Sequence, residues 1–500
     1  MTGVEKQTNI SRSAWTTLAI LSCLGLITMY GETMVLPAIP DFIRDFNISY
    51  STSSWILSSY LIAGAVMTPI AGRLSDIYGK KKILLIVMAV YSTGILAGGF
   101  ANSIGFMLAA RAAQGIGMSM FPIAFGIIRE ILPEKKLAIG QTIFSSTFSG
   151  GAVVGLIVGA AIIQNFGWQA TFFSIFPIAV ILGLIIRRIV HVRDATSSEM
   201  KVERSKGGGS NKDSSTTTQT IDLKGTLALA VTIISFLAGI SFLESNGINT
   251  GFQVAALFSI AAVSVTVFII IEKKVSSPLL DLKLMTHKMI LPATIILMIV
   301  FLCMFMVYQT VPIMVRSPQP LGFGGDAVVT ASVQLPFMIV LLIGTIMSGF
   351  ILNKVGNTRL TLLGTIISAI GFFSLLLFHS TEFMVSATLA IISAGLSLSI
   401  TGGFNVVLLS APIEATGIAL GMTLLLNLVG MSIGPSIAAM FQQMYQGTVE
   451  GMVGQQFPTQ DAYNLIFLTA AIISLASVAL GLVLARRKII AGKISSTPAQ

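Results

Sequence analysis

Charged residues are scarce in this 500-residue sequence: they make up 10% of the chain, whereas 54% of its residues are hydrophobic. Soluble globular proteins carry about 25% charged residues, so the sequence lacks the polar surface that a water-soluble fold needs. Cysteine is limited to Cys23 and Cys303, which lie inside apolar runs and leave neither a disulfide framework nor a redox or zinc signature. The composition therefore indicates an integral membrane protein.

Catalytic signatures are also missing. The three histidines, His191, His287 and His379, are scattered along the chain, so neither a catalytic triad nor a metal site is predicted. No P-loop is present, which argues against ATP as the energy source. A polytopic enzyme that acts on lipids is an alternative, but clustered His, Cys, Asp and Glu residues are lacking. We predict that the protein is not an enzyme and carries no cofactor.

Long apolar runs dominate the sequence. A spanning helix needs about 20 such residues, because each rises about 1.5 Å through a hydrocarbon core roughly 30 Å thick. Fourteen runs meet this length: residues 14–38, 52–72, 83–101, 105–128, 138–164, 168–187, 224–243, 251–271, 289–312, 327–352, 360–379, 383–410, 415–443 and 462–485. We predict an all-α polytopic membrane protein with fourteen transmembrane helices, the first of them an uncleaved span rather than a signal peptide.

The basic residues predict the orientation. With the N-terminus in the cytoplasm, 27 of the 30 Lys and Arg residues fall inside, whereas Arg44 and Arg316 fall outside and Arg111 lies within a span. Cytoplasmic loops are enriched in Lys and Arg, so we expect a multi-pass plasma-membrane protein with both termini cytoplasmic. The net charge of +10 has the same origin, and no nucleic-acid partner is expected.

A hydrophilic segment rich in Gly, Ser and Thr divides the chain and reads as a flexible cytoplasmic linker. The predicted organisation is a six-helix bundle over 14–188, the linker over 189–222, two extra central helices over 223–274 and a second six-helix bundle over 289–488.

An internal repeat supports this division. Gly72–Lys82 and Gly349–Arg359 both carry Gly at the first and eighth positions and a basic residue at the eleventh, at an offset of 277. The pairs Gly151/Gly155 and Gly430/Gly434 repeat independently at an offset of 279. Parallel repeats are typical of secondary transporters in which one half rocks against the other.

Gly72–Lys82 also resembles the loop between helices two and three of the major facilitator superfamily, specifically its fourteen-helix drug:proton antiporter branch. The resemblance assigns a conformational role to this loop, although Ile77 stands where the family usually has a basic residue. The corresponding residues are Gly72, Arg73, Asp76, Gly79, Lys80 and Lys81.

Two charged residues within spans are the predicted proton-coupling pair. The segment around Arg111 resembles the family's helix-four motif, whose Arg takes part in proton transfer, and an Arg inside a span needs a cavity or a partner. Glu32 is the only acid well inside a predicted span, in a segment that resembles the first-helix motif with Glu in place of Asp. Snorkelling of Arg111 to the interface and an interfacial position of Glu32 are the alternatives.

Further candidates follow from the same resemblance. Gly151, Gly155 and Gly159 resemble the antiporter motif of helix five, although Leu156 replaces a Pro, and small-xxx-small spacing is also a general packing device. The polar side chains that we expect to line a substrate cavity are Gln114, Tyr308, Gln309, Asn405 and Asn427.

The resemblance implies proton-coupled export of amphipathic or cationic drug-like compounds, with the proton gradient as energy source. A proton symporter or uniporter of a small nutrient with the same fold is the alternative. The expected partners are a small-molecule substrate, protons and the lipid bilayer. We expect a monomer, in which the extra helices do not line the substrate path.

Overall fold

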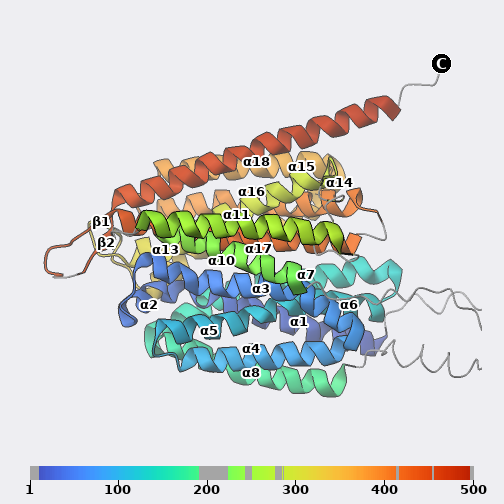
Figure 1. Cartoon of the computed structure of the whole chain (residues 1–500), viewed down its shortest axis with the longest axis horizontal. Coiled ribbons are helices and arrows are strands. Elements are labelled where there is room, and N and C mark those ends of the chain that lie inside the picture. The colour runs from blue at the N-terminus through green and yellow to red at the C-terminus, as the bar shows by residue number, and fades with distance from the viewer. Residues whose placement is uncertain are drawn as a thin grey trace, which may run out of the picture.

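The computed structural model describes residues 11–190, 223–242, 250–275, 284, 286–412, 416–452 and 455–495. Nearly all of the predicted 189–222 linker therefore lies outside the described residues. Long helices run side by side along the long axis of the molecule (Figure 1). We call the end at which the first helix begins and the last helix ends the terminal end, and the opposite end the far end.

The first half of the chain is helical throughout its described length. Its elements are α1 (Arg12–Thr33), the 3-10 turn η2 (Leu36–Ala38), α2 (Ile39–Asp45), α3 (Tyr50–Tyr78), α4 (Lys80–Gly99), α5 (Ile104–Gly115), the 3-10 turn η3 (Ile116–Ser119), α6 (Met120–Ile131), α7 (Glu134–Phe166) and α8 (Trp168–Ile189).

The second half repeats this pattern after two intervening helices. Those two helices are α10 (Leu223–Phe242) and α11 (Thr250–Lys274). They are followed by α13 (Ile290–Arg316), α14 (Ala327–Val355), α15 (Asn357–Leu377), α16 (Glu382–Ser410), α17 (Thr416–Met444), the short antiparallel strands β1 (Gln446–Gly447) and β2 (Phe457–Pro458), and α18 (Gln460–Ser495). The strands pair at the far end (Figure 1).

Two helices that start at the far end, α3 and α14, are capped by short polar side chains. Ser49 accepts a hydrogen bond from the amide of Thr52 at 3.0 Å, and Asp326 accepts one from Val329 at 2.9 Å. Such caps satisfy amides that have no partner within the helix. They fix where α3 and α14 begin.

Among the described residues, twelve helices are long and apolar enough to cross a membrane, not the predicted fourteen. The predicted span 105–128 is not one helix, because η3 separates α5 from α6. Gly117 packs closely at this break: a Cβ at this position would lie 2.5 Å from the ring of Tyr91. The predicted span 224–243 is represented by the shorter apolar stretch Lys224–Ile240 of α10.

The repeat seen in the sequence has a structural counterpart. Gly79 ends α3 with a φ of 95°, and Gly356 ends α14 with a φ of 85°. L-residues rarely adopt this conformation, so the eighth position of both repeated segments requires Gly. The first positions, Gly72 and Gly349, have no atoms within 4 Å of an added Cβ.

The glycines of the predicted fifth span, which lie on α7, permit close helix contacts, and so do their counterparts on α17. A Cβ on Gly155 would lie 2.7 Å from the carbonyl oxygen of Tyr30, and one on Gly159 would lie 2.8 Å from the Cα of Met34, so α7 packs directly on the backbone of α1. Gly434 approaches the backbone of α13 in the same way, with a Cβ 2.9 Å from the amide of Met306.

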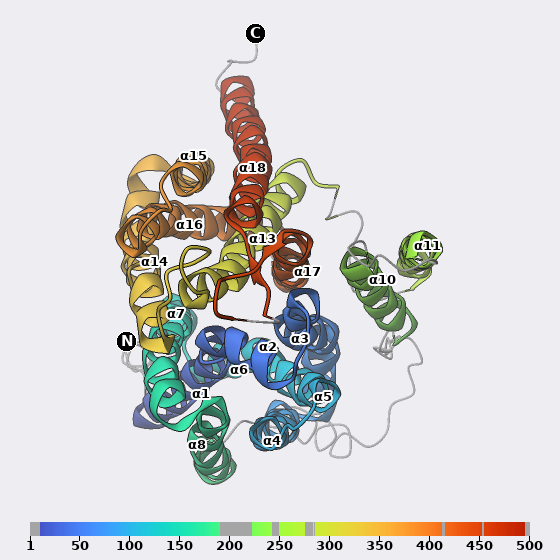
Figure 2. The same ribbon diagram turned by 90° about the vertical axis from the view of Figure 1, so that its left-hand side faces the viewer.

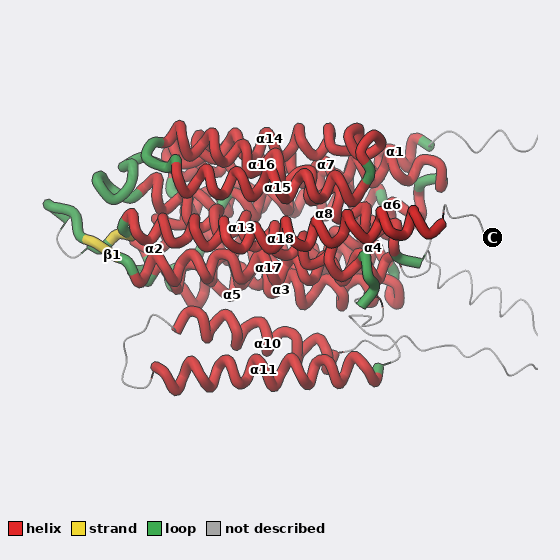
Figure 3. The backbone as a smooth tube through the Cα atoms, turned by 90° about the horizontal axis from the view of Figure 1, so that it is seen from above, coloured by secondary structure: helices red, strands yellow, loops and turns green. Residues whose placement is uncertain are grey.

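Helices α10 and α11 stand beside the bundle rather than within it (Figure 2, Figure 3). Helix α10 contacts α3 of the first half and α17 of the second half, whereas the extensive contacts of α11 are with α10.

Polar interactions join the two halves at the far end. The amide of Tyr50 donates to the side chain of Gln443 at 3.0 Å, and the hydroxyl of Ser58 donates to the carbonyl of Ser432 at 3.0 Å. Arg316 also forms an ion pair with Asp41. These contacts close the bundle at the far end.

Candidate functional site

Glu32 lies in the last turn of α1, where the helix approaches the far end. Its side chain is buried, with 7% of its surface exposed, and Oε2 has no hydrogen-bond partner. The regular helix ends just beyond the acid, at Thr33, and Pro37 lies in the 3-10 turn η2 that follows. The carboxyl group is therefore held inside the bundle at the end of a regular helix.

Arg111, on α5, is completely buried and is held mainly by backbone oxygens. Its Nε donates to the carbonyl of Ile56 at 3.1 Å, and its Nη1 donates to the carbonyl of Gly31 at 3.4 Å. The guanidinium carbon lies 4.5 Å from the ring centroid of Tyr60. Burial of a cation is costly unless such partners compensate for lost water, so these contacts position Arg111 within the bundle.

Gln114 extends this network. It accepts from Arg111 Nη1 at 2.8 Å and donates through Nε2 to the carbonyl of Gly94 at 2.9 Å. The side chain is 1% exposed and both of its polar groups are used, so Gln114 ties α5 to α4. In this structure it positions Arg111 rather than lining an open cavity.

Glu32 and Arg111 are neighbours without a direct ion pair. Their closest connection among the described interactions runs through the carbonyl of Gly31, and both Glu32 Oε2 and Arg111 Nη2 lack partners. Glu32 interacts electrostatically with Arg111, and also with Tyr60, Tyr91 and Tyr308. The structure thus places the predicted pair in one region, together with tyrosines from both halves of the chain.

Tyr308 and Gln309 bring α13 of the second half to this region. Tyr308 packs between Phe305 and Phe337, with ring centroids 5.1 and 5.5 Å away. Gln309 is fully buried; its Nε2 donates to Ser53 of α3 at 3.1 Å, whereas its Oε1 is unpaired. Gln309 therefore connects the two halves and retains a free acceptor.

The two predicted asparagines differ from each other. Asn427 is buried on α17, and neither polar atom of its side chain has a partner. Asn405 lies in the last two turns of α16, near the terminal end, and donates to Thr401 of its own helix at 2.8 Å. The structure therefore does not place Asn405 at the depth of Glu32.

The predicted loop motif lies at the terminal end. Lys80 forms an ion pair with Glu130 at the end of α6, and Lys81 is half-buried at the start of α4. The side chains of Arg73 and Asp76 lie outside the described part of the structure.

Several polar residues of this region were missed in the sequence. Gln334 on α14 and Gln442 on α17 are buried, and both polar atoms of each side chain are unpaired. Tyr91 donates to the carbonyl of Ile27 at 3.2 Å beside Arg111. A polar amide within an apolar run is a usable signal for Gln334 and Gln442, whereas nothing local distinguishes Tyr91.

Comparisons with known proteins all point to membrane transporters. Residues 21–435 match the family model described as Major Facilitator Superfamily. The chain is 25% identical over 369 residues to the multidrug transporter protein MdtP of Bacillus subtilis, which covers 73% of this chain and 64% of that protein, so the match spans less than two thirds of the relative. It is 24% identical over 424 residues to the multidrug efflux pump LfrA of Mycolicibacterium smegmatis, covering 83% and 78%. The fold resembles the xylose transporter XylE from E. coli, with a TM-score of 0.60, 13% identity and coverage of 93% and 97%.

Proposed function

Because this chain belongs to the Major Facilitator Superfamily, we propose that it is a secondary transporter that exports amphipathic or cationic drug-like compounds in exchange for protons. The observation that carries this proposal is the buried, unpaired carboxyl oxygen of Glu32 beside Arg111. Ionisable side chains inside a membrane bundle mark ion and proton pathways. The names of the multidrug relatives favour drug efflux over nutrient uptake.

The surroundings of Glu32 suit a cation. Tyr60, Tyr91 and Tyr308 interact electrostatically with the carboxyl group, and the ring of Tyr60 already contacts one cation, the guanidinium of Arg111. In the proposed cycle, a proton and a cationic substrate compete for the same carboxylate. Arg111, held by backbone carbonyls, stays in place while the occupant of Glu32 changes.

The far-end contacts support alternating access. The polar interactions described above join the halves there, through Tyr50 and Gln443, Ser58 and Ser432, and Asp41 and Arg316. We infer that this structure represents the state closed at the far end, and that rocking of one half against the other opens it.

We further infer fourteen membrane spans with cytoplasmic termini in a plasma membrane. Helices α5 and α6, joined by η3, together are long enough to cross, and α10 runs antiparallel to the spanning helix α11. Adding these two spans to the twelve places both termini on the same side. The basic residues favour the cytoplasm for that side.

Proton release from purified protein tests the function. Addition of ethidium, a cationic dye, to the chain in weakly buffered detergent should release protons. Glu32→Gln should weaken ethidium binding and abolish the release even at ethidium concentrations that saturate the variant. Glu382→Gln, an exposed acid at the start of α16, is the matched control and should behave as wild type. Undiminished release from Glu32→Gln would place the proton site elsewhere, and proton uptake on substrate binding would favour a symporter.

A further inference from the structure

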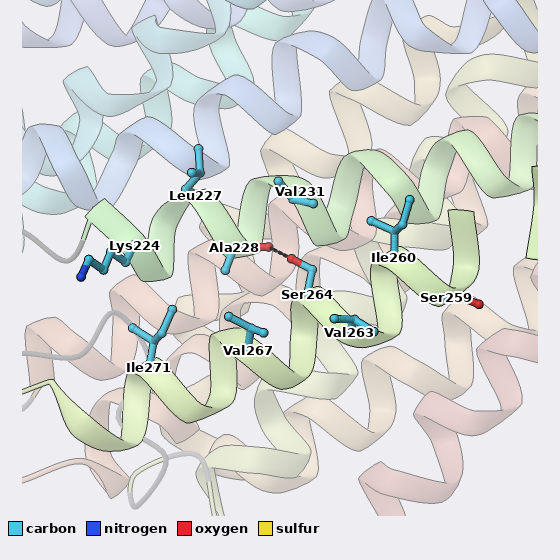
Figure 4. A pocket seen from close by; sticks show the side chains of 10 residues that line it. All are labelled: Lys224, Leu227, Ala228, Val231, Ser259, Ile260, Val263, Ser264, Val267 and Ile271. Atoms are coloured by element: carbon cyan, nitrogen blue, oxygen red, sulfur yellow. Dashed lines mark hydrogen bonds between the residues drawn. The ribbon is translucent and has the colours of Figure 1, made fainter. Parts of the chain in front are cut away.

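An open groove of about 670 Å³ runs between α10 and α11 (Figure 4). Its walls are apolar and include Leu227, Val231, Val263 and Val267. The hydroxyl of Ser264 donates to the carbonyl of Ala228 at 2.7 Å. Its proton is therefore already used, and an apolar occupant leaves no donor unpaired. The volume lies within the roughly 300–1,000 Å³ typical of small-molecule sites.

Positive charge is concentrated at one end of the groove. Lys224 lines the groove at the start of α10, and Lys273 and Lys274 follow at the adjoining end of α11. All three side chains are exposed, whereas the acid next to them, Glu272, is buried. An occupant therefore meets a net positive charge at this end and hydrocarbon beyond it.

The dimensions of the groove match one leaflet of a bilayer. The lining residues of α11 extend from Ser259 to Ile271, which is about 18 Å at 1.5 Å per residue. Half of a hydrocarbon core about 30 Å thick is about 15 Å. Lys224 and Ile271 mark the same end (Figure 4), so the charge lies where lipid headgroups would be.

We propose that this groove binds a phospholipid with an anionic headgroup. The headgroup phosphate contacts Lys224, with Lys273 and Lys274 nearby, and one acyl chain lies between α10 and α11. Basic residues next to membrane helices recognise anionic lipids in this way. A second copy of the chain fits less well, because a symmetric contact would bring two sets of lysines together.

A lipid bound in this groove would affect a helix that contacts both halves of the protein. Helix α10 contacts α3 of the first half and α17 of the second half, whereas the extensive contacts of α11 are with α10. A lipid that joins α11 to α10 therefore completes an element that touches both halves. This site is separate from Glu32 and does not depend on what the protein transports.

Lipid-specific fluorescence quenching tests the proposal. Val263→Trp places a reporter in the groove of the full-length protein, which is reconstituted with brominated phosphatidylglycerol or brominated phosphatidylcholine. The signal of the native tryptophans is subtracted using protein without the reporter. We expect preferential quenching by phosphatidylglycerol, and Lys224→Gln should reduce this preference about fivefold, as for one basic residue near an anionic surface.

Lys354→Gln is the matched control, because Lys354 is an exposed lysine at the terminal end of α14, outside the groove. It should leave the preference unchanged. Native mass spectrometry of the chain without the reporter repeats the comparison. If both lipids quench the reporter equally and Lys224→Gln changes nothing, the groove is only surrounded by bulk lipid without selectivity. That result would overturn the proposal. A reporter shielded from both lipids in a dimeric particle would assign the groove to a second copy and overturn it as well.

Discussion

Arg316 and Asp41 form a two-point ion pair that joins the end of α13 to α2 at the far end of the bundle. Nη2 of Arg316 lies 2.8 Å from Oδ1 of Asp41, Nη1 contacts Oδ2, and Nη1 also donates to the carbonyl of Pro37 at 3.1 Å. Asp41 is 6% exposed. Planar, bidentate pairs of this kind are among the stronger polar contacts in proteins, so this one stabilises the closed far end.

Loss of this pair should open the far end. We expect Asp41→Asn to increase labelling of a cysteine at Ser58, between the halves, by a membrane-impermeant thiol reagent several-fold in a background without Cys23 and Cys303. Arg316→Gln should give a similar increase, because it removes the same pair but leaves the 3.2 Å ion pair between Arg44 and Asp41 within α2. Asp45→Asn is the control, because Asp45 binds Arg44 and Trp168 within the first half. Unchanged labelling in Asp41→Asn would show that other contacts keep the far end closed.

Lysine should not replace Arg111. Its ammonium group cannot reproduce the fork of donors that reaches Ile56, Gly31 and Gln114, and each buried acceptor left unpaired costs about 1–3 kcal/mol. We expect Arg111→Lys to lose transport and to lower the melting temperature. Gln114→Ala, which keeps both backbone acceptors, should have a smaller effect on melting. Equal melting of Arg111→Lys and wild type would contradict the observed hydrogen bonds.

Two glycines of α7, Gly150 and Gly155, should respond differently to alanine. A Cβ on Gly155 lies 2.7 Å from a backbone oxygen of α1, whereas one on Gly150 meets nothing within 4 Å. Overpacking costs about 1–3 kcal/mol, so Gly155→Ala should lower thermal stability in detergent. Gly150→Ala should melt at or slightly above the wild-type temperature because Ala favours helix. The same melting temperature for both variants would refute direct contact between α1 and α7.

The α3–α4 junction should require Gly at one position only. Gly79 has a positive φ, whereas Gly72 lies in a helix with free space around it. We expect Gly79→Ala to cost about 1–3 kcal/mol through backbone strain and to accelerate hydrogen exchange at the start of α4. Gly72→Ala should leave exchange there unchanged. Similar exchange in both variants would argue against the observed backbone geometry.

Sequence reasoning reached the helical class and the two-half repeat because both depend on local patterns. Apolar runs indicate spans directly, and the repeated glycines mark positions with special backbone requirements, as Gly79 and Gly356 show. The break at η3 was missed because Gly115, Gly117 and Ser119 are small residues that are also common within membrane helices. The close approach of Gly117 to Tyr91 involves another helix, so the local sequence does not reveal it.

The site was predicted only in part for the same reason. Glu32 and Arg111 were identified because charge inside an apolar run is a local signal. The partners of Arg111 are mostly backbone oxygens of α1 and α3, which carry no signature in the sequence. The pairing of Asp41 with Arg316 depends on the arrangement of the two halves and was likewise not predicted.

The backbone contacts of Arg111 also affect how this sequence can vary. The carbonyl that accepts from Nε belongs to Ile56, and every amino acid at that position supplies the same oxygen. Genetic drift at position 56 can therefore change the side chain without removing the acceptor, as long as the replacement fits the space. Arg111 is thus buffered against mutation of this neighbour, and a partner formed by a side chain would have to coevolve with it.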